Sequence, residues 1–129
     1  MHAFDYAIVR VVPRVERGEF LNCGVVLFSS TQAWLGARIE LDRERLRMLD
    51  PTLDCDLVAS HLESIPRICA GGADAGPIGL LPQRARFHWL VAPRSTVVQM
   101  SPVHSGVHDN LEVALENLFN RLVRPPEKS

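Results

Sequence analysis

The chain has 129 residues, of which 47% are apolar, so it suits one compact domain with a sizeable core and is too short for two ordinary domains. Acidic and basic residues nearly cancel, 15 against 14, so no global field favours nucleic acid or an anionic membrane. No apolar window approaches about 18 residues and no leader pattern opens the sequence. We therefore expect a cytoplasmic protein without membrane contact.

The first third of the sequence predicts three strands. Residues 4–12 are rich in aromatic and β-branched types, turn formers follow at 13–18, and the apolar run 20–28 then completes a hairpin. Both faces of that second strand are apolar, which predicts a central strand, and Gly24 within it predicts a bulge or a close backbone approach. Residues 33–41 alternate, which predicts a half-exposed third strand with Trp34 outward.

Three helices follow from caps and spacing. Asp42 can cap a short helix that ends at Leu49, and apolar residues at helical spacing predict a longer helix over 57–69, which Pro66 should kink or restart. His61 lies on the apolar stripe of that helix, where we expect a core or boundary histidine. Asp109 and Glu112 form a capping-box pattern that opens a helix over residues 111–122.

The remaining segments complete an α+β pattern. Residues 70–85 are rich in glycine and proline and predict a flexible loop, while 86–92 and 96–101 read as two strands joined by a turn at Pro93 and Arg94. Residues 125–129 follow the last helix and are expected to be a disordered tail. We predict a single domain over 1–129, with a mainly antiparallel sheet of about five strands and two to three helices packed against it.

The segment RGEFLNCGVVLF, residues 17–28, places Glu19 and Asn22 inside what should be a buried strand. An unpaired buried polar group costs roughly 1 to 3 kcal/mol, so both need dedicated partners or a use. Folding the hairpin brings Arg10 near Asn22 or Phe20, with Glu19 a diagonal reach away, so an Arg10–Glu19 ion pair is one expectation. Such a pair with a satisfied amide could equally serve only to fix the register of the hairpin.

A second polar cluster lies between Phe87 and His108, in the text FHWLVAPRSTVVQMSPVHSGVH. A guanidinium, hydroxyls, an amide and an imidazole in one tract would suit an anion or a polar ligand. They could instead bond the local backbone of a hairpin turn, with the histidine exposed in a loop. The candidates in this tract are Arg94, Ser95, Gln99, Ser101 and His104.

No metal or cofactor is expected. His104 and His108 have helical spacing, but Pro102 and Gly106 favour a loop there, and no third ligand is marked. The glycines lack the lysine and hydroxyl of a phosphate loop, and no serine occupies a nucleophile-elbow pattern. Three widely spaced cysteines in apolar surroundings read as reduced core residues: Cys23, Cys55 and Cys69.

The segments YAIVRVVPR, RGEFLNCGVVLF and FHWLVAPRSTVVQMSPVHSG together resemble the bacterial family catalogued as domain of unknown function 3037, most closely its actinobacterial branch. The resemblance spans nearly the whole chain, and Cys23 stands where valine is usual. The first motif corresponds here to Arg10, Pro13, Gly18, Glu19, Asn22 and Gly24. The downstream motif corresponds to Pro93, Arg94, Ser95, Gln99, Ser101, Pro102, His104 and Gly106.

The resemblance implies no known activity. Members of the family are often encoded beside HipA-like kinases, which implies, by association, a small partner or modulator of such a kinase. We therefore predict a non-catalytic binding or regulatory protein. The alternative is a small hydrolase or transferase, with His104 as acid or base, Arg94 as an anion clamp and Glu19 orienting or polarising. Nucleic-acid binding through local arginines is a third option, which the overall charge and the scarcity of outward aromatics disfavour.

Overall fold

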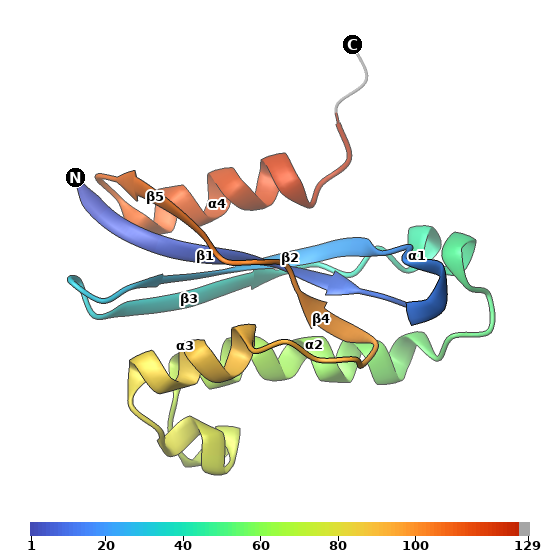
Figure 1. Cartoon of the computed structure of the whole chain (residues 1–129), viewed down its shortest axis with the longest axis horizontal. Helices are drawn as coiled ribbons and strands as arrows, with labels where there is room; N and C mark the ends of the chain where they lie inside the picture. Colours follow the sequence, from blue (N-terminus) through green and yellow to red (C-terminus); the bar gives the residue numbers. More distant parts are fainter. Residues whose placement is uncertain (127–129) are drawn as a thin grey trace.

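The computed structural model describes residues 1–126 and shows three layers, with a five-stranded antiparallel sheet between α4 (Leu111–Leu122) on one face and α2 (Cys55–Ala70) and α3 (Gln83–Val91) on the other (Figure 1). The expected single α+β domain is confirmed. It has four α-helices in the described part of the chain, slightly more than expected, the fourth being the short α1 (Arg43–Leu49). No helix in residues 1–126 combines the length and the apolar character that a membrane span requires.

The sheet is built around its first strand. β1 (His2–Val11) pairs on one side with β2 (Leu21–Ser29), which in turn pairs with β3 (Trp34–Ile39). On its other side, β1 pairs with β5 (His104–His108) along its first residues and with β4 (Val98–Met100) along its last ones. The two ends of β1 therefore hold different neighbours, and the chain crosses from one to the other at residues 101–103.

A β-bulge in β2 decides which side chains lie on which face. Val9 pairs with Gly24 and Arg10 pairs with Asn22, so Cys23 is the extra residue, as the glycine predicted. A Cβ at Gly24 would lie 2.5 Å from the Ile39 Cδ1 atom and 2.6 Å from the Arg38 carbonyl oxygen, so the close approach is real as well. Since side chains alternate along a strand, the extra residue moves Asn22 to the face that α4 covers and leaves Cys23 on the other.

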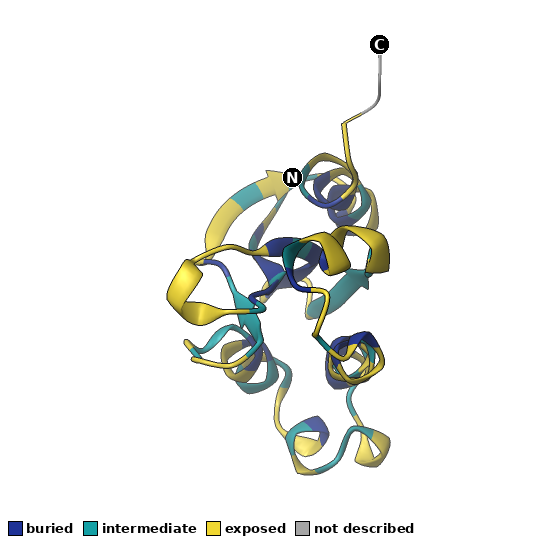
Figure 2. Ribbon diagram, turned by 90° about the vertical axis from the view of Figure 1, so that its right-hand side faces the viewer, coloured by how far each residue is buried: buried dark blue, intermediate teal, exposed yellow. Residues whose placement is uncertain are grey.

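Two apolar cores lie on either side of the sheet, and Figure 2 shows the buried residues in the sheet and on the inward sides of the helices. The larger core lies between the sheet, α2 and α3. The smaller core lies beneath α4, whose apolar stripe is confirmed. The outward face of β3 is also covered, because Trp34 packs against the smaller core and the Arg38 guanidinium lies 4.7 Å from the ring of Phe119.

One of the predicted strands is a helix. Residues 86–92 fall largely in α3, where Phe87 and Leu90 are buried at helical spacing and Phe87 stacks on Phe28. The Arg86 side chain donates to the Ile68 and Cys69 carbonyls at the end of α2, at 2.9 and 2.7 Å, and so ties the two helices together. These tertiary contacts override the strand-like composition of this segment.

The fifth strand lies instead at His104–His108, where the sequence predicted a loop. Gly106 permits it, because a Cβ there would lie 2.7 Å from the Phe4 ring of the neighbouring β1. The last helix is capped by Asn110 and not by Asp109, since the Asn110 Oδ1 atom accepts from the Val113 amide at 3.1 Å.

The other helices follow the sequence pattern with small differences. Asp42 caps α1 as predicted, accepting from the Arg45 amide, and α2 runs through Pro66 without restarting. His61 is exposed and does not lie in the core, because the buried face of α2 is turned away from it.

The glycine-rich stretch contains two 3₁₀ helices, η2 (Ala73–Ala75) and η3 (Pro77–Leu80), before α3 begins. Its flexibility stays a prediction. The predicted tail begins at two exposed prolines, and its last three residues, 127–129, lie outside the described residues.

Candidate functional site

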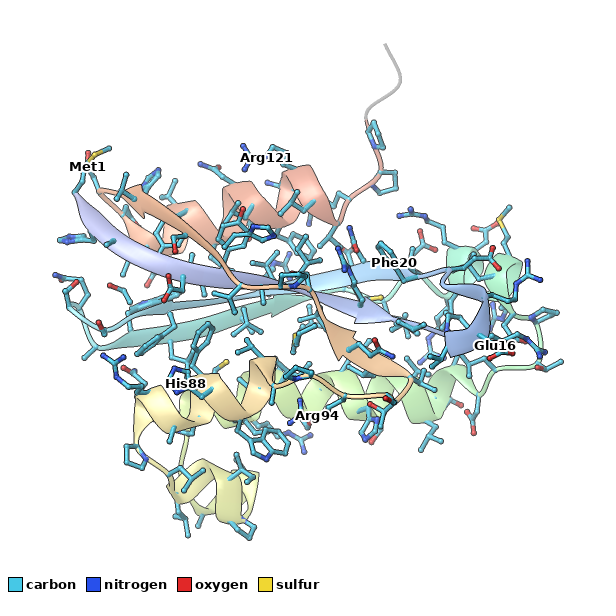
Figure 3. All side chains as sticks on the ribbon, in the orientation of Figure 1. Met1, Glu16, Phe20, His88, Arg94 and Arg121 are labelled. Atoms are coloured by element: carbon cyan, nitrogen blue, oxygen red, sulfur yellow. The ribbon has the colours of Figure 1, made fainter. Side chains whose placement is uncertain are left out.

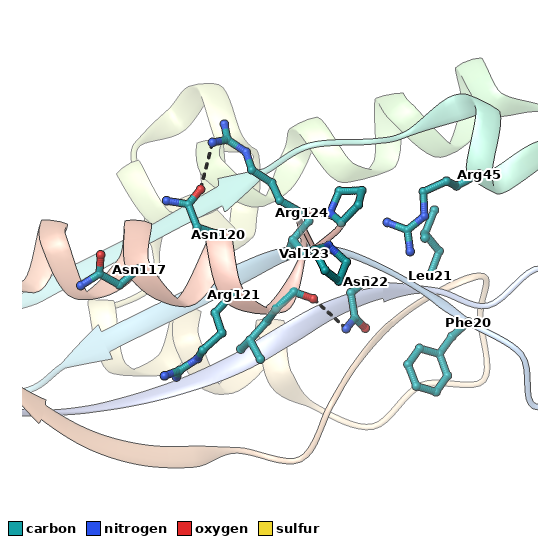
Figure 4. Close-up of a pocket in the computed structure, with 12 residues that line it drawn as sticks. Phe20, Leu21, Asn22, Arg45, Asn117, Asn120, Arg121, Val123 and Arg124 are labelled. Atoms are coloured by element: carbon teal, nitrogen blue, oxygen red, sulfur yellow. Dashed lines mark hydrogen bonds between the residues drawn. The ribbon is translucent and has the colours of Figure 1, made fainter. Parts of the chain in front are cut away.

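A groove opens on the upper face of the sheet where α4 ends (Figure 4). It lies between the last turn of α4, the first residues of β2 and helix α1, and it encloses about 960 Å³. We call it the α4-end groove. Its polar and aromatic lining consists of Phe20, Asn22, Arg45, Asn117, Asn120, Arg121 and Arg124.

Among the residues that the structure describes, the lining of the α4-end groove has guanidinium groups from two separate parts of the chain and no carboxylate, so it is positively charged. Arg124 is partly neutralised, because its Nε atom lies 3.4 Å from a Glu40 oxygen and its Nη1 donates to Asn120. The side chains of Arg45 and Arg121 make no hydrogen bond or ion pair within residues 1–126. Their positive charge is therefore available to a ligand.

Carboxylates do lie nearby, in a hollow beside the groove that Glu40 and Asp42 help to line. Glu40 is the partner of Arg124, and the Asp42 carboxylate accepts from the Arg45 amide as the cap of α1. Both are thus engaged in structural contacts, and the groove keeps an excess of positive charge.

Three of the sequence-predicted residues form a row across the open end of the sheet. Asn22 on β2, Arg10 on β1 and Gln99 on β4 are register partners. The Asn22 Nδ2 atom donates to the Leu122 carbonyl at 3.0 Å, and the Arg10 guanidinium lies 4.2 Å from the centre of the Phe20 ring. Gln99 donates to the Thr96 carbonyl at 2.8 Å, so it also supports the turn before β4.

Glu19 does not join this row. It precedes β2, its side chain is 44% exposed, and its carboxylate binds Arg17 in the same turn. The expected position of Glu19 in a buried strand and its expected pairing with Arg10 were both wrong, because β2 begins two residues later at Leu21.

Arg94 lies on the opposite side of the sheet, at the end of α3, as Figure 3 shows by comparison with Phe20. Its Nη1 and Nη2 atoms donate to the Leu90 and Trp89 carbonyls at 3.0 and 2.6 Å, and its guanidinium lies 4.3 Å from the Trp89 ring centre. A cation at the carbonyl end of a helix satisfies acceptors that have no intrahelical partner. Arg94 therefore closes α3.

Ser101 fills the break between β4 and β5. It is 3% exposed, its Oγ atom accepts from the Ile8 amide at 2.8 Å, and its own amide donates to the Ile8 carbonyl at 2.9 Å. Ser101 thus bonds both backbone groups of Ile8, a residue of β1 that pairs with neither β4 nor β5. The Ser101 hydroxyl also donates to the Pro102 carbonyl.

The remaining candidates of the downstream tract are exposed. The His104 ring contacts the Tyr6 ring in a tilted arrangement, with ring centres 5.4 Å apart, and Ser95 lies on the surface after α3. No hydrogen bond or ion pair in the described part of the chain joins His104, Arg94 or Glu19 to one another. The structure does not bring these three residues together.

The cysteines and histidines of the described residues form no metal-binding cluster. Burial raises the pKa of the Cys23 and Cys69 thiols to about 12, so both stay neutral and unreactive near neutral pH. Within residues 1–126 there is no group of three or more metal-ligating side chains. The His108 Nδ1 atom accepts from the Asn110 amide at 2.9 Å, at the turn into α4.

The sequence reasoning missed the residues that give the groove its charge. Arg45, Asn117 and Arg121 were not singled out, because each looks like an ordinary solvated residue of a helix surface. One signal was available. The exposed residues in the last two turns of α4 and just after it are amides and guanidinium groups at helical spacing, whereas the carboxylates of the helix, Glu112 and Glu116, precede them; the residues are Asn117, Asn120, Arg121 and Arg124.

No curated protein and no solved structure matches the chain. One family model does, described as "Protein of unknown function (DUF3037)", and it matches residues 6–123. That range runs from within β1 past the end of α4, so it includes all four α-helices, at least part of each strand pairing, and both cores except Phe4. The chain therefore belongs to the DUF3037 family of proteins of unknown function.

Proposed function

We propose that this protein is a non-catalytic binding protein that recognises an acidic segment of a protein partner in the α4-end groove. The observation that carries the proposal is the pair of guanidinium groups, Arg45 and Arg121, that enter one open groove from separate elements and have no carboxylate partner within residues 1–126. Arginine suits this role because its planar donors match the geometry of a carboxylate.

A protein segment fits the groove better than a nucleic acid does. The net charge of the chain is −1, so the positive charge is local to the groove and does not form the broad basic surface that a nucleic-acid backbone needs. Phe20 is the aromatic side chain in the lining, and Arg10 already occupies a position over its ring. The family resemblance implies a HipA-like kinase as the partner, so we propose an acidic segment of such a kinase as the occupant.

The proposal is tested by affinity capture from native cells with three forms of the protein. The test variant carries Arg45→Glu and Arg121→Glu. The control carries Arg47→Glu and Arg67→Glu, which changes the net charge equally at exposed positions outside the groove lining. We expect one partner to be retained by the wild type and the control and lost with the test variant.

Direct binding of the purified partner should then weaken more than tenfold in the test variant, and the affinity of the wild type should fall as salt is raised. Recovery of no specific protein, or equal recovery with all three forms, would overturn the proposal.

A further inference from the structure

Two buried polar atoms have no hydrogen-bond partner in the described part of the chain: the Arg10 Nε atom and the Asn22 Oδ1 atom. Leaving such an atom unsatisfied costs about 1 to 3 kcal/mol, so native structures contain few of them and each needs an explanation. Both belong to the row at the open end of the sheet, beside the α4-end groove.

The chemistry of the two atoms is complementary. Arg10 and Asn22 are direct partners on antiparallel strands, so their side chains project from the same face about 5 Å apart at Cβ. One offers a hydrogen-bond donor and the other an acceptor. A carboxylate or a fully ionised phosphate brings acceptors alone and would leave the Asn22 oxygen unsatisfied, whereas a peptide group brings one acceptor and one donor.

The surroundings hold both atoms in this orientation. The Asn22 amide cannot be turned over, because its other end lies 3.0 Å from the Leu122 carbonyl, which only a donor can satisfy. The Arg10 guanidinium lies over the Phe20 ring, which fixes the plane of its donors. Both atoms have almost no exposed surface in the free protein, so a ligand reaches them only after the side chains that cover them move aside.

We infer that Arg10 and Asn22 recognise the main chain of an extended peptide segment: the Arg10 Nε–H donates to a peptide carbonyl and the Asn22 Oδ1 atom accepts from a peptide N–H. This inference rests on the proposed function and gives its ligand a form. Arg45 and Arg121 lie on either side of Asn22 (Figure 4), so acidic side chains flanking the recognised peptide group reach them from both directions. The site therefore recognises an extended acidic segment through one peptide group of the ligand and the acidic side chains that flank it.

The probe is a synthetic pentapeptide of four glutamates around a central phenylalanine, blocked at both ends, with a set of analogues that are each N-methylated at one amide. Dissociation constants are measured by NMR titration of the intact protein. For the wild type we expect one analogue, and not the others, to bind roughly tenfold more weakly, because N-methylation removes the donor that Asn22 accepts.

Two variants assign the atoms. In Asn22→Ala that one analogue and its parent should bind equally, since the acceptor is gone. Arg10→Lys keeps the charge but replaces Nε by a methylene group, and it should weaken every peptide roughly fivefold while preserving the difference between parent and analogue. Circular dichroism and melting confirm that each variant is folded, because Asn22 also holds the end of α4.

The outcomes separate this inference from the proposed function. If the pentapeptide binds and depends on Arg45 and Arg121, but no analogue binds more weakly and Arg10→Lys has no effect, the main-chain inference is overturned while the acidic-segment proposal stands. If the pentapeptide does not bind, or binds equally to the Arg45→Glu, Arg121→Glu protein, both are overturned. Tighter binding of inorganic phosphate or of a short single-stranded DNA than of the peptide also overturns the inference.

Discussion

The two motif regions of this chain, Arg10 to Gly24 and Pro93 to Gly106, are both rich in polar side chains, but these side chains have different roles in the two regions. In the downstream region, Ser101 satisfies the backbone of β1 and Arg94 closes α3. In the first region, Arg10 and Asn22 keep a donor and an acceptor unpaired beside an open groove.

The difference shows that polar residues without a partner nearby in the sequence have two distinct roles. Some compensate for a defect of secondary structure, such as a helix end or a gap between two strands, and their hydrogen bonds are complete in the folded chain. Others have side-chain donors or acceptors that remain without a partner within residues 1–126. The distinction depends on where each backbone group finds its partner, and the following predictions test it from the largest expected effect to the smallest.

Gly24→Ala should have the largest effect on stability. The new methyl group would collide with the Arg38 carbonyl of the neighbouring strand β3, and overpacking of this kind costs about 3 kcal/mol of unfolding free energy. Urea denaturation measures the loss. Gly18→Ala is the control, because nothing lies within 4 Å of its Cβ and only its positive φ of 71° resists the change, at about 1 kcal/mol. Equal losses would show that the bulge is not closely packed.

Ser101→Ala should lower the unfolding free energy by about 2 kcal/mol, because the buried Ile8 amide loses its acceptor. The matched control is Ser105→Ala, at an exposed position whose hydroxyl donates to Asp5, with an expected change within about 0.5 kcal/mol. Both are measured by urea denaturation. A Ser101→Ala protein of wild-type stability would remove Ser101 from the group of structural polar residues.

Arg94→Ala should cost about 1 to 2 kcal/mol, because two carbonyls at the end of α3 lose a charged donor that is partly exposed to solvent. Binding of the acidic pentapeptide should stay unchanged, since Arg94 lies on the other face of the sheet. Both quantities are measured on the same preparation. If the Arg94→Ala protein folds but no longer binds the peptide, the two motif regions form one binding site and the distinction between them is wrong.

The smallest effect is the pH dependence contributed by Asp50, next to the hairpin turn of the first region. Hydrogen bonds from the Thr52 hydroxyl and amide, at 2.6 and 2.9 Å, lower the pKa of this carboxyl, and Arg14 lies 3.5 Å away. The pKa of Asp50 is then lower in the folded than in the unfolded chain. The contribution of Asp50 to the unfolding free energy is therefore complete above the ordinary pKa range of a carboxyl group, and it is lost as the pH falls through the pKa of the folded state.

The measurement for Asp50 is urea denaturation in steps from about pH 6 to about pH 3. Stability of the wild type should fall more steeply over this range than that of Asp50→Asn, which has no charge to lose. Asp74→Asn, at an exposed position, serves as the control and should follow the wild type. Parallel curves for wild type and Asp50→Asn would contradict the role of Asp50.

Much of the fold could be predicted because the information is local. The hairpin, the cap at Asp42 and the stripe of α4 each depend on residues within a few positions of one another. Residues 86–92 could not be assigned correctly, because Phe, Trp and Val favour strands. The helix is stabilised by tertiary contacts of Phe87 with β2 and of Arg86 with α2. Part of the site could be predicted, since the sequence placed Arg10 near Asn22 or Phe20. The charged residues that line the groove could not be predicted, because each looks like an ordinary residue of a helix surface.

The sequence by itself determined the α+β class, the first three strands and most of the helices, and it marked Gly24 as the place of a bulge or a close backbone approach, because periodicity, caps and glycine geometry are properties of short segments. Only the tertiary structure decided which polar residues are structural and which remain available. The Asn22 amide donates to a carbonyl 100 residues away. Arg45 and Arg121, which are far apart in the sequence, line the same groove. No local pattern carries that information, because hydrogen-bond partners are chosen by how the layers pack.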